Sequence, residues 1–508
     1  MIVLVLTASL ILVTQTLITR ALSRRASVSF GQYNISNLDV AMISIPFDPI
    51  RVSTAGYTTF SSLYQSKPIS ITYPGCAMGF ATLFVFLMLF ATAAFAQNIA
   101  LDPGQDLSSE RNGWLPYAFS TDALGTTAGV AAFSTGRFRQ PQTSLLGTAF
   151  ASANDSWGAL GAINNMKLPG TERLFLDSFL LLGHFTDSRY YIDLDRDPEE
   201  AKAGSNDSSQ SDFVTGISND VQFDINLKFP LPIGIARDNP VTIYNLDRGL
   251  PGNDVNVPGR WNPLEGGKTI ASVKFFSRYQ DLEESSQEDL LIARTNGLEL
   301  VLEHDNTDFL RNPTRGSRQK FTLTRDFGWF NSSNSWTNLQ IDLSKYFNLG
   351  GSGLFRQQVL AFNFWAADTP TWSPDPVNPQ IVRHRPPPYM GSTLGGFDRL
   401  RAFPSGRFND KSAVYTTAEM RLMPRTGPLR DYSLLNYFEI DWFQLVPFIE
   451  AGRVGPEFNS DLLTDDLQVT GGIDLRIMAF RNVFRIGWAT DSEGESQIWA
   501  MFSQPFSR

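Results

Sequence analysis

Three histidines are the side chains whose chemistry could most readily support catalysis. His184, His304 and His384 lie far apart in the sequence, and no Gly-x-Ser-x-Gly or His-Glu-x-x-His pattern occurs. His384 stands between Arg383 and Arg385, a setting that suits contact with an anion better than general-base chemistry. We therefore expect no enzyme activity and no catalytic residue.

A short acidic segment is the other group that could bind an ion. The five carboxylates between Asp193 and Glu200 offer the oxygen ligands that Ca²⁺ prefers, but their spacing matches no EF-hand loop. We therefore interpret 195–212 as a solvated loop and expect neither a metal nor a cofactor. The net charge of -9 and the lack of a basic run argue against a nucleic-acid partner.

Other charged residues recur at every second position of apolar segments. Val221, Phe223, Ile225, Leu227 and Phe229 alternate with Gln222, Asp224, Asn226 and Lys228; Ile473, Leu475 and Ile477 alternate with Asp474 and Arg476; Ala418, Met420 and Leu422 alternate with Thr417, Glu419 and Arg421. Successive side chains of a strand point to opposite faces, so each segment has one apolar and one polar face. Such alternation over about ten residues is typical of strands that separate lipid from a polar lumen.

The composition agrees with a membrane protein that crosses by strands. Only 18% of the 508 residues are charged, 12% are aromatic, and the mean hydropathy is -0.14. After residue 97 no segment approaches the ~18 continuous apolar residues of a membrane helix. The single cysteine, Cys76, precedes that point, so the expected mature chain has no thiol to form a stray disulfide in an oxidising compartment.

Aromatic clusters and the end of the chain fit the same class. Trp329-Phe330, Trp336 and Trp442-Phe443 stand at the ends of predicted strands, where an aromatic girdle would meet the lipid interface. At the carboxyl end, Ile498, Ala500, Phe502 and Phe506 share one parity and predict a terminal membrane strand over 496–506.

The pattern predicts an all-β fold, a transmembrane antiparallel β-barrel of sixteen strands over 123–508. The strands are expected near 123–134, 143–153, 157–167, 172–184, 188–194, 212–229, 268–280, 291–304, 318–328, 336–347, 354–366, 411–423, 436–452, 467–479, 483–490 and 496–506. An even number is usual for bacterial barrels. The Pro- and Gly-rich segment 230–267 could be a loop or an extra hairpin.

The amino-terminal region predicts export. Residues 78–96 form an apolar run that ends in Ala94-Phe95-Ala96, a small-x-small cleavage site before Gln97. We interpret 78–96 as a signal peptide and 97–122 as a short periplasmic segment. Residues 1–77 are then expected to be an upstream extension from a wrongly assigned start codon, with Met78 as the initiator. An unusually long signal or an inner-membrane anchor are the alternatives.

Several motifs in order resemble the BamA/TamA (bacterial surface antigen) superfamily. Leu394-Gly395-Gly396-Phe397-Asp398-Arg399-Leu400-Arg401-Ala402-Phe403 is similar to its sixth-loop motif, and Phe448-Ile449-Glu450-Ala451-Gly452 to its Phe-x-Asp-x-Gly strand motif. The segments 305–317 and 487–506 resemble its periplasmic turn and closing hairpin. The resemblance covers about 120–508. The family's POTRA domains would not fit in 97–122, so we expect a barrel-only member.

The resemblance implies a long sixth loop, 367–410, that folds into the lumen. Arg401 at its tip would meet Glu450 on the barrel wall, as a planar guanidinium suits a bidentate carboxylate contact. The other residues implied in this loop lock are Phe403, Glu419 and Arg421, with Gly395 and Gly396 as the loop-motif glycines. Two positions depart from the family: Ala402 replaces a Gly and Glu450 an Asp. If position 402 needed a positive φ, Ala402 would distort the tip and Arg401 would contact Glu419 or Asp441 instead.

Three functions remain open. The resemblance favours outer-membrane biogenesis, in which a barrel with separable first and last strands inserts or moves proteins or lipids. The alternatives are a plugged channel or passive transporter for small solutes, and a structural, surface-exposed barrel. The expected location is the bacterial outer membrane. The expected partners are its lipids and either unfolded outer-membrane proteins or a periplasmic partner protein, because the missing POTRA domains would otherwise receive the substrate.

Overall fold

A single antiparallel sheet of sixteen strands dominates the structure, confirming the predicted strand number. The computed structural model describes residues 100–101, 110–121, 124–192, 201–244, 246–247, 249–251, 262–284, 287–374, 382–425, 440–479, 482–492, 494–502 and 506. Both the predicted extension 1–77 and the predicted signal peptide 78–96 lie outside these residues. Within the described ranges, no helix has the length and apolar character needed to span a membrane.

Each strand pairs with the next one along the chain. The strands are β2 (Arg111–Thr121), β3 (Gly125–Thr135), β4 (Ser144–Ser152), β5 (Trp157–Lys167), β6 (Phe175–Tyr190), β7 (Val214–Pro230), β11 (Lys268–Glu284), β12 (Gln287–Asp305), β13 (Gly316–Asp326), β14 (Trp336–Gly350), β15 (Phe355–Asp368), β20 (Ser412–Pro424), β21 (Trp442–Gly455), β22 (Gln468–Ala479), β23 (Asn482–Asp491) and β24 (Ser496–Phe502).

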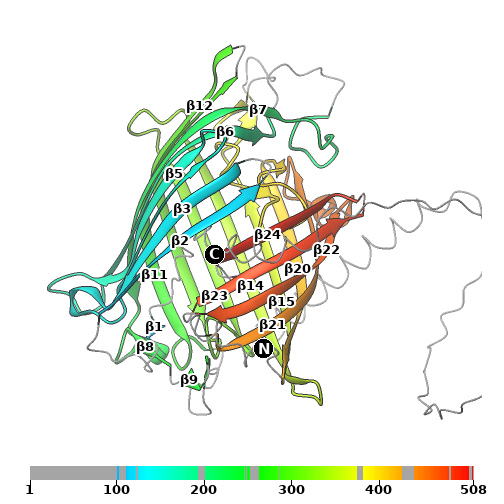
Figure 1. The fold of residues 1–508 in the computed structure, drawn as a ribbon. Helices are drawn as coiled ribbons and strands as arrows, with labels where there is room; N and C mark the ends of the chain where they lie inside the picture. Colours follow the sequence, from blue (N-terminus) through cyan, green and yellow to red (C-terminus); the bar gives the residue numbers. More distant parts are fainter. Residues whose placement is uncertain are drawn as a thin grey trace, which may run out of the picture.

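The sheet curls into a barrel-shaped shell, and both edge strands, β2 and β24, lie on the side that faces the viewer in Figure 1. Contacts across the interior require this curvature. Asn206, in the connection after β6, accepts a hydrogen bond from the Val454 N–H (3.0 Å) and donates one to the Asp466 carbonyl (2.9 Å). Val454 belongs to β21, eight strands away from β6 in the sheet. Among the described residues, no backbone pairing joins β2 to β24.

The shell has two ends, which we name by what they contain. The terminal end contains the start of β2 and the finish of β24, and the loop end contains the opposite tips of these strands. The sixth connection at the loop end, 369–411 between β15 and β20, is the longest there. The predicted boundaries of this loop, 367–410, therefore differ from the observed ones by two residues or fewer.

The outer face is an apolar belt, as the alternation predicts. Phe223 on β7, Leu302 on β12, Phe321 on β13 and Leu475 on β22 are all more than one third exposed. Soluble monomers rarely expose a continuous apolar surface that extends over many neighbouring strands. Because apolar residues cover this face strand after strand, it suits hydrocarbon rather than water.

The inner face carries the charged residues of the same strands. Asp224, Lys228, Glu419, Asp474 and Arg476 alternate with the belt residues and are all buried inside the shell. The predicted parity of β7, β20 and β22 is confirmed. Burial of so many charges requires partners inside the lumen, because an unpaired ion in a confined space is costly.

The predicted strand number is right, but two boundaries are wrong. The predicted strands 172–184 and 188–194 are one strand, β6, with a bulge between Phe185 and Ser188 that interrupts the apolar alternation. The sheet begins at β2, inside the segment 97–122 that we interpreted as periplasmic. Pro116 and Gly113 hide this strand from a pattern search, although an edge strand tolerates proline.

Three aromatic predictions are also wrong. Trp336 and Trp442 are buried inside the shell and do not join an outer girdle, whereas Trp329 and Phe330 are exposed at the loop end. Strand β24 ends at Phe502, and Phe506 does not continue its outer face but packs inside against Tyr346 of β14. A position at a strand end predicts where a side chain lies along the barrel axis. It does not predict whether the side chain lies on the outer or the inner face.

Further connections cover both ends of the shell. At the loop end, Arg407 donates to the Ser208 hydroxyl (2.9 Å) and the Asn409 N–H donates to the Gly204 carbonyl (2.8 Å). The segment 201–212 is thus part of a cap on the sixth loop rather than the solvated loop we predicted. The predicted acidic cluster 193–200 lies outside the described residues.

At the terminal end, the described parts of the segment 231–267 reach the far wall at β21. Its pieces include η3 (Gly234–Ala236), β8 (Thr242–Ile243), β9 (Leu246–Asp247) and β10 (Leu250–Pro251), and β8 pairs with β1 (Ala100–Leu101). Trp442 of β21 donates its indole N–H to the Gly249 carbonyl (3.0 Å). Leu250 packs against Met423, Trp442, Met478 and Val483. The described parts of this segment therefore lie over the terminal end of the shell and are not an extra pair of membrane strands.

Candidate functional site

The sixth loop enters the interior through a closed base. The Thr369 N–H donates to the Lys411 carbonyl (2.8 Å), so the two ends of the loop leave the wall together. Within the loop, β16 (Ser373–Pro374) pairs with β17 (Val382–Arg383), and β18 (Thr393–Leu394) pairs with β19 (Phe408–Asn409). The segment 395–407 between β18 and β19 forms the tip.

Two glycines shape the tip. Gly395 and Gly396 have φ values of 101° and 99°, in the left-handed region that favours glycine. A Cβ on Gly395 would lie 2.2 Å from the Pro404 carbonyl oxygen, so the chain crosses itself too closely for a side chain. The Gly396 N–H donates to the Phe403 carbonyl (2.8 Å) and fixes the far side of the turn.

The departure from the family at Ala402 causes no backbone strain. Among the described tip residues other than glycine, Leu400 and not Ala402 has a left-handed φ, of 52°. Leu400 is fully buried, so its packing offsets the cost of this conformation, about 1–3 kcal/mol. The distortion considered from the sequence does not arise, and Arg401 reaches the wall residue that the resemblance implied.

The structure brings Arg401 and Glu450 together. The Arg401 Nε lies 2.8 Å from Glu450 Oε1, and the Arg401 backbone N–H donates to Oε2 at 2.8 Å. Glu450 thus holds both the side chain and the main chain of the tip. It also accepts hydrogen bonds from the Tyr415 hydroxyl and from Thr470 Oγ1 (2.9 Å). All its oxygen contacts come from fully buried groups.

Arg401 also reaches two further carboxylates. Its Nη1 lies 3.0 Å from Asp474 Oδ2, and its Nη2 lies 3.5 Å from Glu419 Oε1. The predicted alternative partner Glu419 therefore contacts Arg401 together with Glu450, not in place of it. Asp441, the other alternative, lies instead beside Gly249 in the cover at the terminal end.

Three wall arginines complete the network. Arg421 lies 3.0 Å from Glu419, and Arg476 lies 2.8 Å from the same carboxylate. Arg485 lies 3.2 Å from Asp474 and 3.8 Å from Asp398 of the tip. The four arginines of this network face the four carboxylates Glu419, Glu450, Asp474 and Asp398, so the cluster is neutral as a whole.

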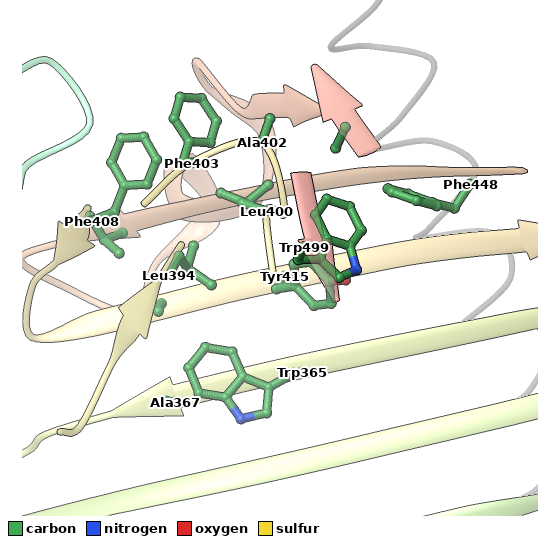
Figure 2. Close-up of a cluster of buried hydrophobic side chains, with 13 residues drawn as sticks. Trp365, Ala367, Leu394, Leu400, Ala402, Phe403, Phe408, Tyr415, Phe448 and Trp499 are labelled. Carbon is green, nitrogen blue, oxygen red and sulfur yellow. The ribbon is translucent and has the colours of Figure 1, made fainter. Parts of the chain in front are cut away.

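The network is buried under an apolar layer. Leu394, Leu400, Ala402, Phe403 and Phe408 of the loop pack against wall residues Trp365, Tyr415, Phe448 and Trp499 (Figure 2). The Arg401 guanidinium lies 3.4 Å from the centre of the Phe448 ring, a close cation–π contact. Phe403 is thus a packing residue of the tip and not a member of the charged network.

Burial and the carboxylates act on Arg401 in opposite directions. Burial alone would lower the pKa of the Arg401 guanidinium, but the charges of Glu450 and Asp474 outweigh it and raise the pKa above the ordinary value. The group is therefore a permanent cation. A buried ion pair adds little net stability when intact, but losing one partner costs about 3–5 kcal/mol. We call the contact of Arg401 with Glu450, Asp474 and Glu419 the latch. Its energetics suit a contact that is either fully formed or fully broken.

The loop also contacts the last strand of the sheet. The Gln497 side-chain nitrogen, in the amide orientation that satisfies both of its polar atoms, donates to the carbonyls of Phe403 (3.0 Å) and Arg401 (3.1 Å). Trp499 of the same strand packs against Phe448. The tip therefore ties edge strand β24 to the wall formed by β20, β21 and β22.

Beside the loop a polar cavity of 230 Å³ remains in the lumen. Charged residues line it, namely Glu299, Lys320, Asp342 and Arg399. Two buried polar atoms at its wall, Trp336 Nε1 and Tyr389 Oη, have no hydrogen-bond partner in the structure. Within the described ranges, no group of three or more His, Cys, Asp or Glu side chains could hold a metal ion.

The predicted site residues fall into three groups. Arg401, Glu450, Glu419 and Arg421 belong to the charged network, Phe403 to the apolar layer, and Gly395 and Gly396 to the turn of the tip. Sequence reasoning placed Asp474 and Arg476 in the lumen but not in the site, and it missed Arg485. Their alternation showed which face they occupy, but not that β22 and β23 stand next to the wall that receives the tip.

The fold and this site define a sixteen-stranded barrel with an occupied lumen. No protein-family model and no curated protein matches the sequence. Among solved structures, the chain is similar to BamA from Haemophilus ducreyi lacking POTRA domains 1-3, at 11% identity over 77% of this chain and 69% of that chain, with a TM-score of 0.42.

Two other solved barrels are similar at comparable values. CdiB from Escherichia coli matches at 9% identity over 77% of this chain and 61% of that chain, with a TM-score of 0.46. CdiB from Acinetobacter baumannii matches at 11% identity over 77% of this chain and 59% of that chain, with a TM-score of 0.41. The chain thus spans about three fifths of the CdiB chains.

Proposed function

We propose that this chain is an integral barrel of the bacterial outer membrane, of the BamA/TamA type, that inserts or translocates proteins or lipids. The apolar outer belt supports a membrane location, because it alternates with a charged inner face on strand after strand. In the proposed orientation, the terminal end of the barrel lies on the periplasmic side of the membrane and the loop end lies on the outer surface. The proposed role is not enzymatic.

One observation carries the proposal. The sixth loop fills the lumen and is latched by Arg401 to buried carboxylates, while the edge strands β2 and β24 share no backbone pairing among the described residues. A filled lumen favours a route at the sheet edges over a route along the axis. Unpaired edge strands offer free N–H and C=O groups that an incoming strand can pair with.

The contacts between the loop tip and β24 support the idea that access to this edge of the sheet is regulated. Gln497 and Trp499 of β24 contact the tip, so release of the latch would also free this edge strand from the wall. The proposed partners are outer-membrane lipids on the belt and, at the edges, either an unfolded outer-membrane protein or a protein delivered by a periplasmic partner.

Depletion of the protein, followed by an inventory of outer-membrane proteins and lipids, tests this function. We expect a subset of outer-membrane proteins, or one lipid class, to fall before growth stops. The sequence has no cysteine after Cys76, so cysteine pairs placed across β2 and β24 can be crosslinked without background. Crosslinking should reproduce depletion, and reduction should reverse it. An unchanged inventory in both experiments would exclude the proposal.

A plugged transporter for small solutes is a second candidate, because of the polar cavity beside the loop. Its lining of Glu299, Lys320, Asp342 and Arg399 suits a polar solute, and Trp336 Nε1 and Tyr389 Oη could donate to one. This function requires solute flux in proteoliposomes that increases when the latch is broken by Arg401→Ala. Flux without any change in the protein and lipid inventory would favour this candidate over the first.

A further inference from the structure

The chain's own Phe506 occupies an apolar pocket in an otherwise charged part of the lumen. Its ring packs against Tyr346, Val359 and Ala361, all buried on the inner faces of β14 and β15. Strand β15 stands five strands away from β24 in the sheet, so the residue reaches across the terminal end of the barrel. A terminal strand that simply met lipid would not place an aromatic ring there.

The pocket has the features of a site for an aromatic residue. Val359 and Ala361 offer an apolar floor, and the small side chain of Ala361 leaves space for a ring. The Tyr346 ring lies 6.4 Å from the Phe506 ring, centre to centre, and the Arg421 guanidinium lies 5.3 Å from the Phe506 ring centre. A cation near an aromatic ring is attracted by the ring's quadrupole, most strongly where water is excluded.

The main chain at Phe506 is recognised as well. Arg318 of β13 donates to the Phe506 carbonyl oxygen, and Glu303 holds the same guanidinium from behind, with Oε1 2.9 Å from Arg318 Nε. Arg318 is itself buried. A ring pocket beside an oriented donor for a backbone carbonyl is the arrangement expected of a peptide-binding site.

Arg421 connects this pocket to the latch. Its guanidinium lies between the rings of Tyr346 (5.1 Å) and Phe506 (5.3 Å) on one side and Glu419 (3.0 Å) on the other. Glu419 in turn contacts Arg401 of the loop tip. If the Phe506 ring left, water would reach Arg421 and weaken its attraction to Glu419, because a higher local dielectric screens an ion pair.

We propose that the pocket of Tyr346, Val359 and Ala361 is a binding site for an aromatic peptide residue, filled in cis by Phe506, and that the filled pocket steadies the loop latch through Arg421. Phe506 is thus a built-in ligand whose departure prepares the loop for release. This inference depends on the geometry of the lumen and not on the proposed function.

Protease access to the sixth loop tests the inference with the full-length protein in lipid vesicles. We expect Phe506→Ala to speed tryptic cleavage within 382–411 about five- to tenfold, an effect between those of an exposed and a fully desolvated cation–π contact. Phe458→Ala, which removes an exposed aromatic ring elsewhere on the chain, is the matched control and should leave the rate unchanged. In an Arg421→Ala background, Phe506→Ala should add nothing.

A peptide of residues 499–508 tests whether the pocket binds an aromatic residue that is not covalently attached to the chain. Added in excess to the Phe506→Ala protein, it should restore slow cleavage, whereas the same peptide carrying Phe506→Ala should not. Ala361→Leu, which fills the pocket from the wall, should mimic Phe506→Ala and serves if that variant does not fold. Wild-type cleavage rates in Phe506→Ala and Ala361→Leu, strict additivity with Arg421→Ala, or failure of the peptide would overturn the inference.

Discussion

The sharpest prediction concerns the latch itself, through Arg401→Ala, Glu450→Ala and the double variant. In the wild type, Arg401 is the only cation within 4.0 Å of Glu450 among the described residues. Arg401→Ala would leave Glu450 without a cation, with only the backbone N–H of residue 401 and the hydroxyls of Tyr415 and Thr470 as partners. Glu419 would keep Arg421 and Arg476, and Asp474 would keep Arg476 and Arg485, so the loss falls mainly on one buried carboxylate.

The magnitudes follow from these partners. Arg401→Ala strands a fully buried carboxylate and removes the contact with Phe448, so opening of the loop should become easier by about 3–4 kcal/mol. Glu450→Ala should cost less, about 2 kcal/mol, because Arg401 retains Asp474 and Glu419. The double variant should be no worse than Arg401→Ala, since the second change removes a charge that is already unpaired.

Cleavage of the loop by a protease reports its open population when closing is fast relative to cutting. Arg401→Ala should therefore raise the cleavage rate within 382–411 by about 150- to 700-fold, since about 1.4 kcal/mol corresponds to a factor of ten. Thermolysin is preferable to trypsin here, because the substitution removes a tryptic site. Arg383→Ala, at an exposed position of the same loop, is the control and should not change the rate.

Strictly additive effects in this cycle would refute the reasoning, because independent residues cannot form a latch. So would an effect of Arg401→Ala below about threefold, the value expected of a solvated ion pair. Such results would mean that the packing of Leu400 and Phe403 holds the loop in the lumen, and that the ion pairs do not contribute to holding it.

Three further predictions follow from the fold and the sequence. Leu475→Arg, on the lipid face of β22, should destabilise the barrel by about 2–4 kcal/mol in urea titrations of vesicle-inserted protein, and Leu475→Phe should not; equal effects would show that the assigned face is wrong. Gly395→Ala should expose the loop to protease, because its Cβ would lie 2.2 Å from the Pro404 carbonyl, whereas Gly353→Ala, with nothing within 4 Å, should be silent. Mass analysis of the outer-membrane form should find Gln97 as the first residue; peptides from 1–77 in that fraction would contradict the predicted processing.

Alternation made the barrel predictable because lipid and lumen impose opposite demands on neighbouring residues. The faces of β7, β20 and β22 follow directly from this period of two. The strand count was right although β6 was divided and β2 was missed, because these two errors cancel. A bulge in β6 and the Pro116 of β2 break the period locally, and no pattern search recovers them.

Part of the site was predictable because its motif lies within one short segment of the sequence. The other residues of the site could not be predicted, because they lie far from that motif in the sequence. Arg401 and Glu450 were paired through a resemblance that covers both segments. Asp474 and Arg485 lie on strands that approach the tip only when the sheet curls, which no local pattern records. The inward turn of Phe506 is of the same kind, since its pocket is on β14 and β15, on another part of the wall.

The cap at the loop end constrains the order in which this barrel can be assembled. Asn206 binds the backbone of Val454 and Asp466, which follow it by 248 and 260 residues in the chain. These bonds cannot form until the carboxyl-terminal strands are in place, and contacts of such long sequence separation are late and slow to form. A half-inserted chain would therefore be an open bowl with an unsealed polar interior. The final strands complete the wall and allow the cap to close in the same step.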